Sequence, residues 1–225
     1  MPYSISISQF VKYWLADTST KKRTVALSLL NQPGGAPYYR DFNSVIQEYV
    51  RTGQTDDSLF ERTIQELRNR QTEEEYERAR INHNIRVLSL AVRRTPFVFR
   101  ENVEIMPNYS FPRIRLEDLE DIDMEISLAP DFVYTYTYRR REYIGALKLY
   151  YAEPPLLERH ANFITSLIKY FLNTNYPEKN IRDCDCRLYD INTGREYTAP
   201  QAIHQRLEQI KEDCRDIYSK IERSI

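Results

Sequence analysis

Asp131 and Lys148 are the two ionisable residues whose surroundings most suggest chemistry, because each lies in otherwise apolar, strand-like sequence. Residues 123–151 alternate apolar or β-branched with polar side chains, which is typical of paired β-strands, and Arg139–Arg141 predicts the turn between them. A carboxylate can act as an oxygen ligand for a hard cation, and a nearby ammonium group favours a developing negative charge. The same two groups can form a structural ion pair, since burying either charge alone is costly.

The length of the turn decides whether these two groups meet. A two-residue turn at Arg139–Arg140 pairs Tyr138 with Arg141, and Asp131 and Lys148 then lie opposite each other on one face of the sheet. A three-residue turn places them on opposite faces. The sequence leaves both registers open, because no Asn-Gly or similar dipeptide specifies the turn.

The segment resembles the PD-(D/E)xK, or restriction-endonuclease-like, nuclease superfamily. The matching residues are Pro130-Asp131 and Ala146-Leu147-Lys148, followed by an amphipathic helix and a further strand, and the resemblance covers residues 124–198. It implies a nuclease-like protein that hydrolyses phosphodiester bonds in DNA or RNA with Mg²⁺ or Mn²⁺. In that reading Asp131 ligates the metal and Lys148 orients or activates the attacking water.

The motif departs from the superfamily at Ala146, which stands where the second acidic ligand is expected. A metal would then need another carboxylate, either Glu125 on the preceding strand or a helical residue such as Glu48 or Glu75. The alternative is a catalytically inactive nuclease-fold module that binds nucleic acid or a protein partner.

A second candidate site is the predicted turn itself, where Arg139, Arg140 and Arg141 follow a tyrosine-rich strand. Arginines neutralise phosphates, and tyrosine rings stack on unpaired bases, so these arginines are the predicted nucleic-acid-binding residues. The competing interpretation is a charged hairpin tip that keeps the sheet edge soluble. The neighbouring tyrosines are Tyr134, Tyr136, Tyr138 and Tyr143.

Composition excludes several other classes of protein. The 32 basic and 33 acidic residues nearly cancel, so any nucleic-acid site must be local. There is no apolar run long enough to span a membrane and no signal-peptide pattern, and we expect a cytoplasmic protein. Disulfide and zinc sites lack the required spacing, and no Walker A, GxGxxG, GxSxG or HExxH motif occurs. The cysteines and histidines are Cys184, Cys186, Cys214, His83, His160 and His204.

The remaining sequence predicts mainly helices around this hairpin. Residues 1–95 are expected to form a helical region that packs on an α/β or α+β core at residues 96–225, with a mixed central sheet and one compact domain overall. Helices are expected at residues 8–16, 20–30, 41–53, 59–93, 156–171 and 200–221, and strands at 97–106 and 184–191. Within these helices, His160 is expected to be packed, not catalytic. The apolar stripe of residues 203–221 packs on the sheet or forms a homodimer seam.

Overall fold

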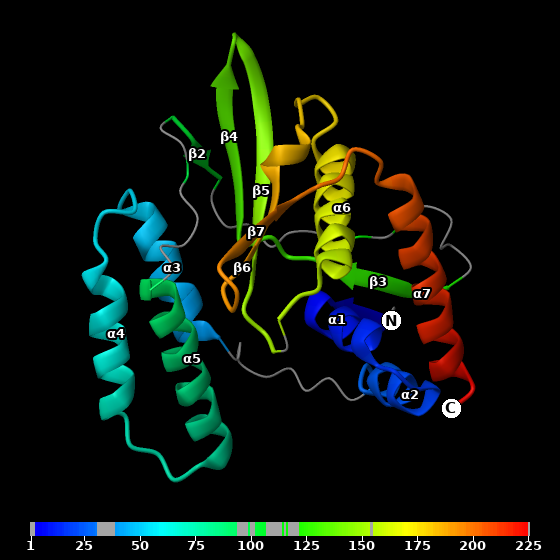
Figure 1. Ribbon diagram of the computed structural model, residues 1–225, viewed down its shortest axis with the longest axis horizontal. Helices are drawn as coiled ribbons and strands as arrows, with labels where there is room; N and C mark the ends of the chain where they lie inside the picture. Colours follow the sequence, from blue (N-terminus) through cyan, green and yellow to red (C-terminus); the bar gives the residue numbers. More distant parts are fainter. Residues whose placement is uncertain are drawn as a thin grey trace. The chain divides into compact units, whose positions relative to one another are not determined.

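The computed structural model describes residues 3–30, 39–93, 99, 102–106, 114, 116, 122–153 and 155–224. The chain divides into two compact units (Figure 1). The first comprises residues 1–32, 100–189 and 196–225, and the second comprises residues 33–99 and 190–195. The first two helices thus belong to the unit that holds the β4–β5 hairpin. The boundary expected at residues 95 and 96 lies outside the described residues.

A five-stranded mixed sheet holds the hairpin predicted from the sequence, and the α/β class is confirmed. Its order is β2-β4-β5-β6-β7, with β2 antiparallel to β4 and β4 antiparallel to β5. A parallel bridge joins Tyr143 of β5 to Asn180, ahead of β6. The strands are β2 (Glu104–Ile105), β4 (Phe132–Tyr138), β5 (Arg141–Tyr150), β6 (Cys186–Asp190) and β7 (Arg195–Thr198).

The helices of the first unit bury their apolar stripes in one core. α6 (Glu158–Asn175) follows β5, and its stripe includes Ile164, Leu167 and Ile168, all fully buried. α7 (His204–Glu222) packs against α6 and α2 (Ser19–Leu27), and its stripe is also buried. The stripe considered as a dimer seam is therefore used inside the chain. None of the described helices is long and apolar enough to cross a membrane.

The N-terminus differs from the sequence prediction because a short strand precedes the first helix. β1 (Tyr3–Ser6) pairs in parallel with β3 (Met124–Ser127), and α1 (Ile7–Leu15) follows directly. Ser6 caps α1 through a capping box with Gln9: Gln9 N donates to Ser6 Oγ over 3.4 Å, and Ser6 N donates to Gln9 Oε1 over 2.9 Å. The two reciprocal bonds satisfy backbone groups that a start at residue 8 would leave open.

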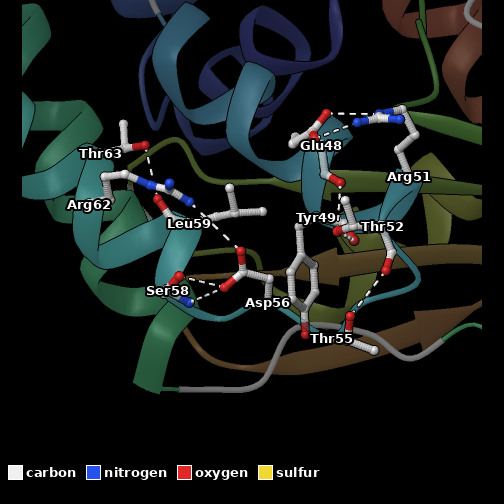
Figure 2. Close-up of polar contacts among 10 residues, drawn as sticks. All are labelled: Glu48, Tyr49, Arg51, Thr52, Thr55, Asp56, Ser58, Leu59, Arg62 and Thr63. Carbon is white, nitrogen blue, oxygen red and sulfur yellow. Dashed lines mark hydrogen bonds and ion pairs between the residues drawn. The ribbon is translucent and has the colours of Figure 1, made fainter.

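The second unit is built from three helices, α3 (Arg40–Arg51), α4 (Ser58–Asn69) and α5 (Glu75–Arg93). The expected helices at residues 41–53 and 59–93 are confirmed, the latter as a helix pair. Just before α4, Asp56 Oδ1 accepts a hydrogen bond from the N–H of Ser58, the first residue of the helix, at 3.1 Å (Figure 2). Buried Asn84 of α5 accepts a bond from Phe42 N at 2.9 Å and so links α5 to α3.

Candidate functional site

The hairpin turn between β4 and β5 contains two residues. This is the register in which Asp131 and Lys148 lie opposite each other. Tyr138 pairs with Arg141, and Arg139 and Arg140 have φ angles of 50° and 62°. Positive φ at both central positions is typical of a type I′ turn, whose twist matches that of the flanking strands. Asn and Gly usually occupy these positions, which explains why two arginines gave no turn signal in the sequence.

This register brings Asp131 and Lys148 together. Lys148 Nζ lies 2.9 Å from Asp131 Oδ2, and both side chains are mostly buried, with exposed fractions of 16% and 12%. Lys148 also donates to the Ala129 carbonyl at 2.9 Å, and Asp131 Oδ2 accepts a second bond from the Leu149 N–H at 2.7 Å. One carboxylate oxygen therefore takes two donors, both supplied by β5.

Lys148 is held in its charged form. Burial alone would lower its pKa, but the negative charge of Asp131, the interaction with Tyr151 and the hydrogen bond to Asp131 outweigh burial and raise the pKa above its ordinary value. Its ammonium group is thus a permanent cation at neutral pH, suited to pairing with an anion and unsuited to removing a proton from water.

The other expected metal ligands lie on elements separate from the β4–β5 hairpin. Ala146 is fully buried in the apolar core, opposite Val133. Glu125 lies on β3, which pairs with β1 in the separate small sheet. Glu48 and Glu75 belong to α3 and α5 of the second unit, where Glu48 is paired with Arg51 at 2.6 Å. Among the described residues, no three His, Cys, Asp or Glu side chains are grouped to hold a metal ion.

These residues do not fit a Mg²⁺ or Mn²⁺ site of the superfamily type. Such a site needs oxygen ligands with lone pairs directed at the ion, and Asp131 Oδ2 is already used by two N–H groups of β5. At the second ligand position, Ala146 offers a methyl group. The described arrangement is an ion pair that ties the start of β4 to β5.

The opposite face of the hairpin carries the tyrosines. Tyr136 and Tyr143 are stacked across the strands, with ring centroids 5.3 Å apart and planes inclined by 13°. The Arg182 guanidinium carbon lies 5.2 Å from the Tyr136 ring centroid, 5.1 Å from that of Tyr143 and 5.7 Å from that of Tyr138. One cation therefore contacts three rings, an arrangement that favours a charged, desolvated guanidinium group.

Asp185 fixes this cluster from the 3₁₀ turn η1 (Asp183–Asp185). Its Oδ2 accepts bonds from the Tyr136 hydroxyl at 2.5 Å and from Arg182 Nε at 2.8 Å. The bond to Asp185 raises the pKa of Arg182, whereas burial, followed by the bond to Asp185, raises the pKa of Tyr136. These raised pKa values keep Tyr136 neutral and Arg182 charged at physiological pH.

The three arginines predicted to bind nucleic acid lie at the exposed tip beside this cluster. The Arg139 guanidinium carbon is 5.2 Å from the ring centroid of Tyr138, whose exposed fraction is 44%. Arg140 and Arg141 are exposed. Sequence reasoning missed Arg182 and Asp185, because they lie about 40 residues downstream and approach the tyrosines only through the position of η1 beside β5.

No protein-family model matches the sequence, and no curated protein is significantly similar to it.

Proposed function

We propose that this protein is a nuclease-like protein of restriction-endonuclease-like fold that binds DNA or RNA without cleaving it at the Asp131–Lys148 pair. The observation that carries this proposal is the ion pair: Asp131 Oδ2 accepts bonds from Lys148 Nζ at 2.9 Å and Leu149 N at 2.7 Å, beside a fully buried Ala146. The carboxylate and ammonium groups neutralise each other and brace the hairpin.

Topology supports the fold part of the proposal. The β4–β5 hairpin carries the Asp and Lys positions, α6 follows β5, and the chain returns to β6 next to β5 in the sheet. This order is the one that the resemblance to the restriction-endonuclease-like superfamily implies. A fold alone does not assign an activity, which has to come from the site.

Nucleic-acid binding is supported by the cluster at the hairpin tip. Tyr138 is partly exposed, Arg139 lies on its ring, and Arg140 and Arg141 extend the positive charge. Arginines of this kind contact phosphates, and a supported aromatic ring stacks on an unpaired base. Because the overall charge is −1, this local concentration of arginine has to supply the attraction.

The second candidate function is Mg²⁺- or Mn²⁺-dependent phosphodiester hydrolysis. The observation that favours it is the two-residue turn, which places Asp131 opposite Lys148 as the superfamily motif requires. In that case Asp131 would be a metal ligand, and Lys148 would contribute its positive charge next to a phosphoryl oxygen.

Cleavage assays with a calorimetric metal titration separate the two functions. We would incubate labelled single- and double-stranded DNA and RNA with Mg²⁺ or Mn²⁺ and compare wild type, Asp131→Ala and the exposed-acid control Asp17→Ala. The proposal predicts intact substrate and the same metal titration for all three proteins. Cleavage or metal binding by wild type and Asp17→Ala that Asp131→Ala abolishes would establish the second function and overturn the first.

A further inference from the structure

A groove follows the seam between α4 and α5, which lie side by side in the second unit (Figure 1). It consists of two adjoining hollows, of about 680 Å³ and 370 Å³, and Arg68 lines both. The larger hollow extends to Arg93 near the end of α5, and the smaller one extends to Arg78 near its start.

Helical spacing shows that the two hollows form one surface. The α5 residues that line them include Arg78, Asn82, Ile85, Ser89 and Arg93, at intervals of three or four residues. Residues at these intervals lie on one face of a helix. The distance from Arg78 to Arg93 along the axis is about 22 Å at roughly 1.5 Å per residue.

The floor and the rim of the groove differ in character. Ile64, Leu67 and Ile81 form the floor, and their exposed fractions are 7%, 0% and 6%, so they present little apolar surface. The charged residues of the rim are exposed and carry five positive charges against one negative charge. They are Arg62, Arg68, Arg70, Arg78, Arg93 and Glu61.

Two of these arginines are neutralised in part by nearby carboxylates. Arg62 lies 3.7 Å from Asp56 (Figure 2), and Arg70 lies 3.0 Å from Asp41. Within the described part of the chain, Arg68, Arg78 and Arg93 form no ion pair, and Arg78 donates to the backbone carbonyls of Thr72 and Glu73. These three guanidinium groups therefore contribute the uncompensated charge of the groove.

We propose that this α4–α5 groove binds the phosphate backbone of a nucleic-acid strand. Along a duplex axis, a length of about 22 Å spans roughly six phosphates of one strand, at about 3.4 Å of axis each. An amphipathic acidic peptide would need several exposed apolar anchors, but the floor is buried, Ile85 is half-buried, and Val92, at 39%, is the exposed apolar side chain among the described lining residues. The choice of nucleic acid among polyanions rests on the function proposed above.

The test measures the salt dependence of binding in EDTA, with fluorescence anisotropy of labelled 20-nucleotide single strands and 20-base-pair duplexes. Each phosphate contact contributes about one unit to the slope of log affinity against log salt concentration. Arg68→Gln/Arg93→Gln should therefore flatten the slope by about two units relative to wild type. The single-charge control is Arg51→Gln on α3, outside the groove, which should leave the slope unchanged.

A charge change of opposite sign strengthens the test. Glu61→Gln removes the carboxylate of the rim and should tighten binding to the same oligonucleotides. All substituted residues are exposed, and the circular dichroism melting curve of each variant checks that it is folded.

Three results would overturn the proposal. If the double variant keeps the wild-type slope while substitutions at Arg139–Arg141 weaken binding, the groove assignment fails and the proposed function stands. If wild type binds no oligonucleotide in EDTA, both fail. If polyglutamate displaces DNA from wild type at equal charge concentration, the groove takes acidic polypeptides instead.

Discussion

At the level of single residues, Asp131 and Lys148 show how one contact limits what a site can do. Lys148 donates to Asp131 and to the Ala129 carbonyl, which uses two of the three N–H groups of an ammonium. The sequence predicted this contact only for a two-residue turn, and the structure confirms that register. Lys148 belongs to an ion pair, and the interactions of that pair raise its pKa despite its burial.

His160 is the residue whose titration should be visible in the stability of the whole chain. Its ring is buried and stacks on Trp14, with centroids 5.4 Å apart, so the expected packed role is confirmed. Arg159 Nε donates to His160 Nε2 at 3.1 Å, which requires an unprotonated acceptor nitrogen. Burial, and then the charge of Arg159, lower the pKa of His160 to about 4.

A lowered pKa means that protons favour the unfolded state. The stability that the neutral His160 contributes should be complete above its unfolded pKa of about 6.5 and should be lost as the pH falls towards 4. Between pH 7 and pH 5 we expect wild type to lose about 1–2 kcal/mol more than His160→Phe. Urea unfolding at both pH values measures this difference, and equal losses in the two proteins would contradict it.

The ring of Tyr134 lies against the backbone of Gly145 in the hairpin, so a side chain at position 145 would collide with it. A Cβ atom at position 145 would lie 2.5 Å from Cζ of the Tyr134 ring, whose hydroxyl donates to the Asp185 carbonyl at 3.2 Å. Gly145→Ala should therefore destabilise the protein by about 1–3 kcal/mol in urea unfolding. In a Tyr134→Leu background the same substitution should cost less, and an undiminished cost there would show that the ring is not the obstacle.

Residue types also explain what sequence reasoning missed at the site. Asp131, Lys148 and Arg139–Arg141 lie within one hairpin, where alternation specifies which side chains share a face. Arg182 reaches the same tyrosines from a separate segment, and local patterning carries no information on which strand neighbours β5. Finding Arg182 and Asp185 required the order of the sheet.

Among the elements, the β4–β5 hairpin has a turn that its residues do not favour. Arg139 and Arg140 both adopt positive φ, which is unfavourable for residues with a Cβ atom. Arg139→Asn/Arg140→Gly should stabilise the protein by about 1 kcal/mol, because both residues suit a type I′ turn. The same double variant should bind oligonucleotides more weakly, since it removes two cations.

These two effects have opposite signs and are measured separately. Urea unfolding reports the stability, and anisotropy in EDTA reports the binding. A variant that is less stable than wild type would contradict the turn geometry. Higher stability with unchanged binding would instead show that the hairpin tip is not part of the binding surface.

The helices were predicted more reliably than the short strands. α3, the α4–α5 pair, α6 and α7 each have an apolar stripe that repeats over several turns, which sets the helical period clearly. β1 has four residues and runs directly into α1, so its alternation is too short to recognise, and α1 begins at Ile7, one residue before the expected start at residue 8. α7 begins at His204, after the expected start at Pro200.

At the level of the whole molecule, a net charge of −1 conceals two local basic surfaces, one in each compact unit. The hairpin tip of the first unit combines arginine with tyrosine, and the α4–α5 groove of the second has arginine above a buried apolar floor. Composition predicts that any nucleic-acid site must be local, but it cannot locate the groove. The groove arises because spaced arginines of α4 and α5 meet when the helices pair.

We propose above all that this chain binds nucleic acid without a metal, through its hairpin tip. Fluorescence anisotropy of a labelled oligonucleotide in EDTA tests it most directly. The comparison uses wild type, the hairpin variant Arg139→Gln/Arg140→Gln/Arg141→Gln, and a control with the same charge change at exposed Arg51, Arg195 and Arg223. We predict binding by wild type, roughly 10-fold or greater weakening in the hairpin variant, and much less in the control. Absence of wild-type binding in EDTA, or equal weakening in both variants, would contradict the claim.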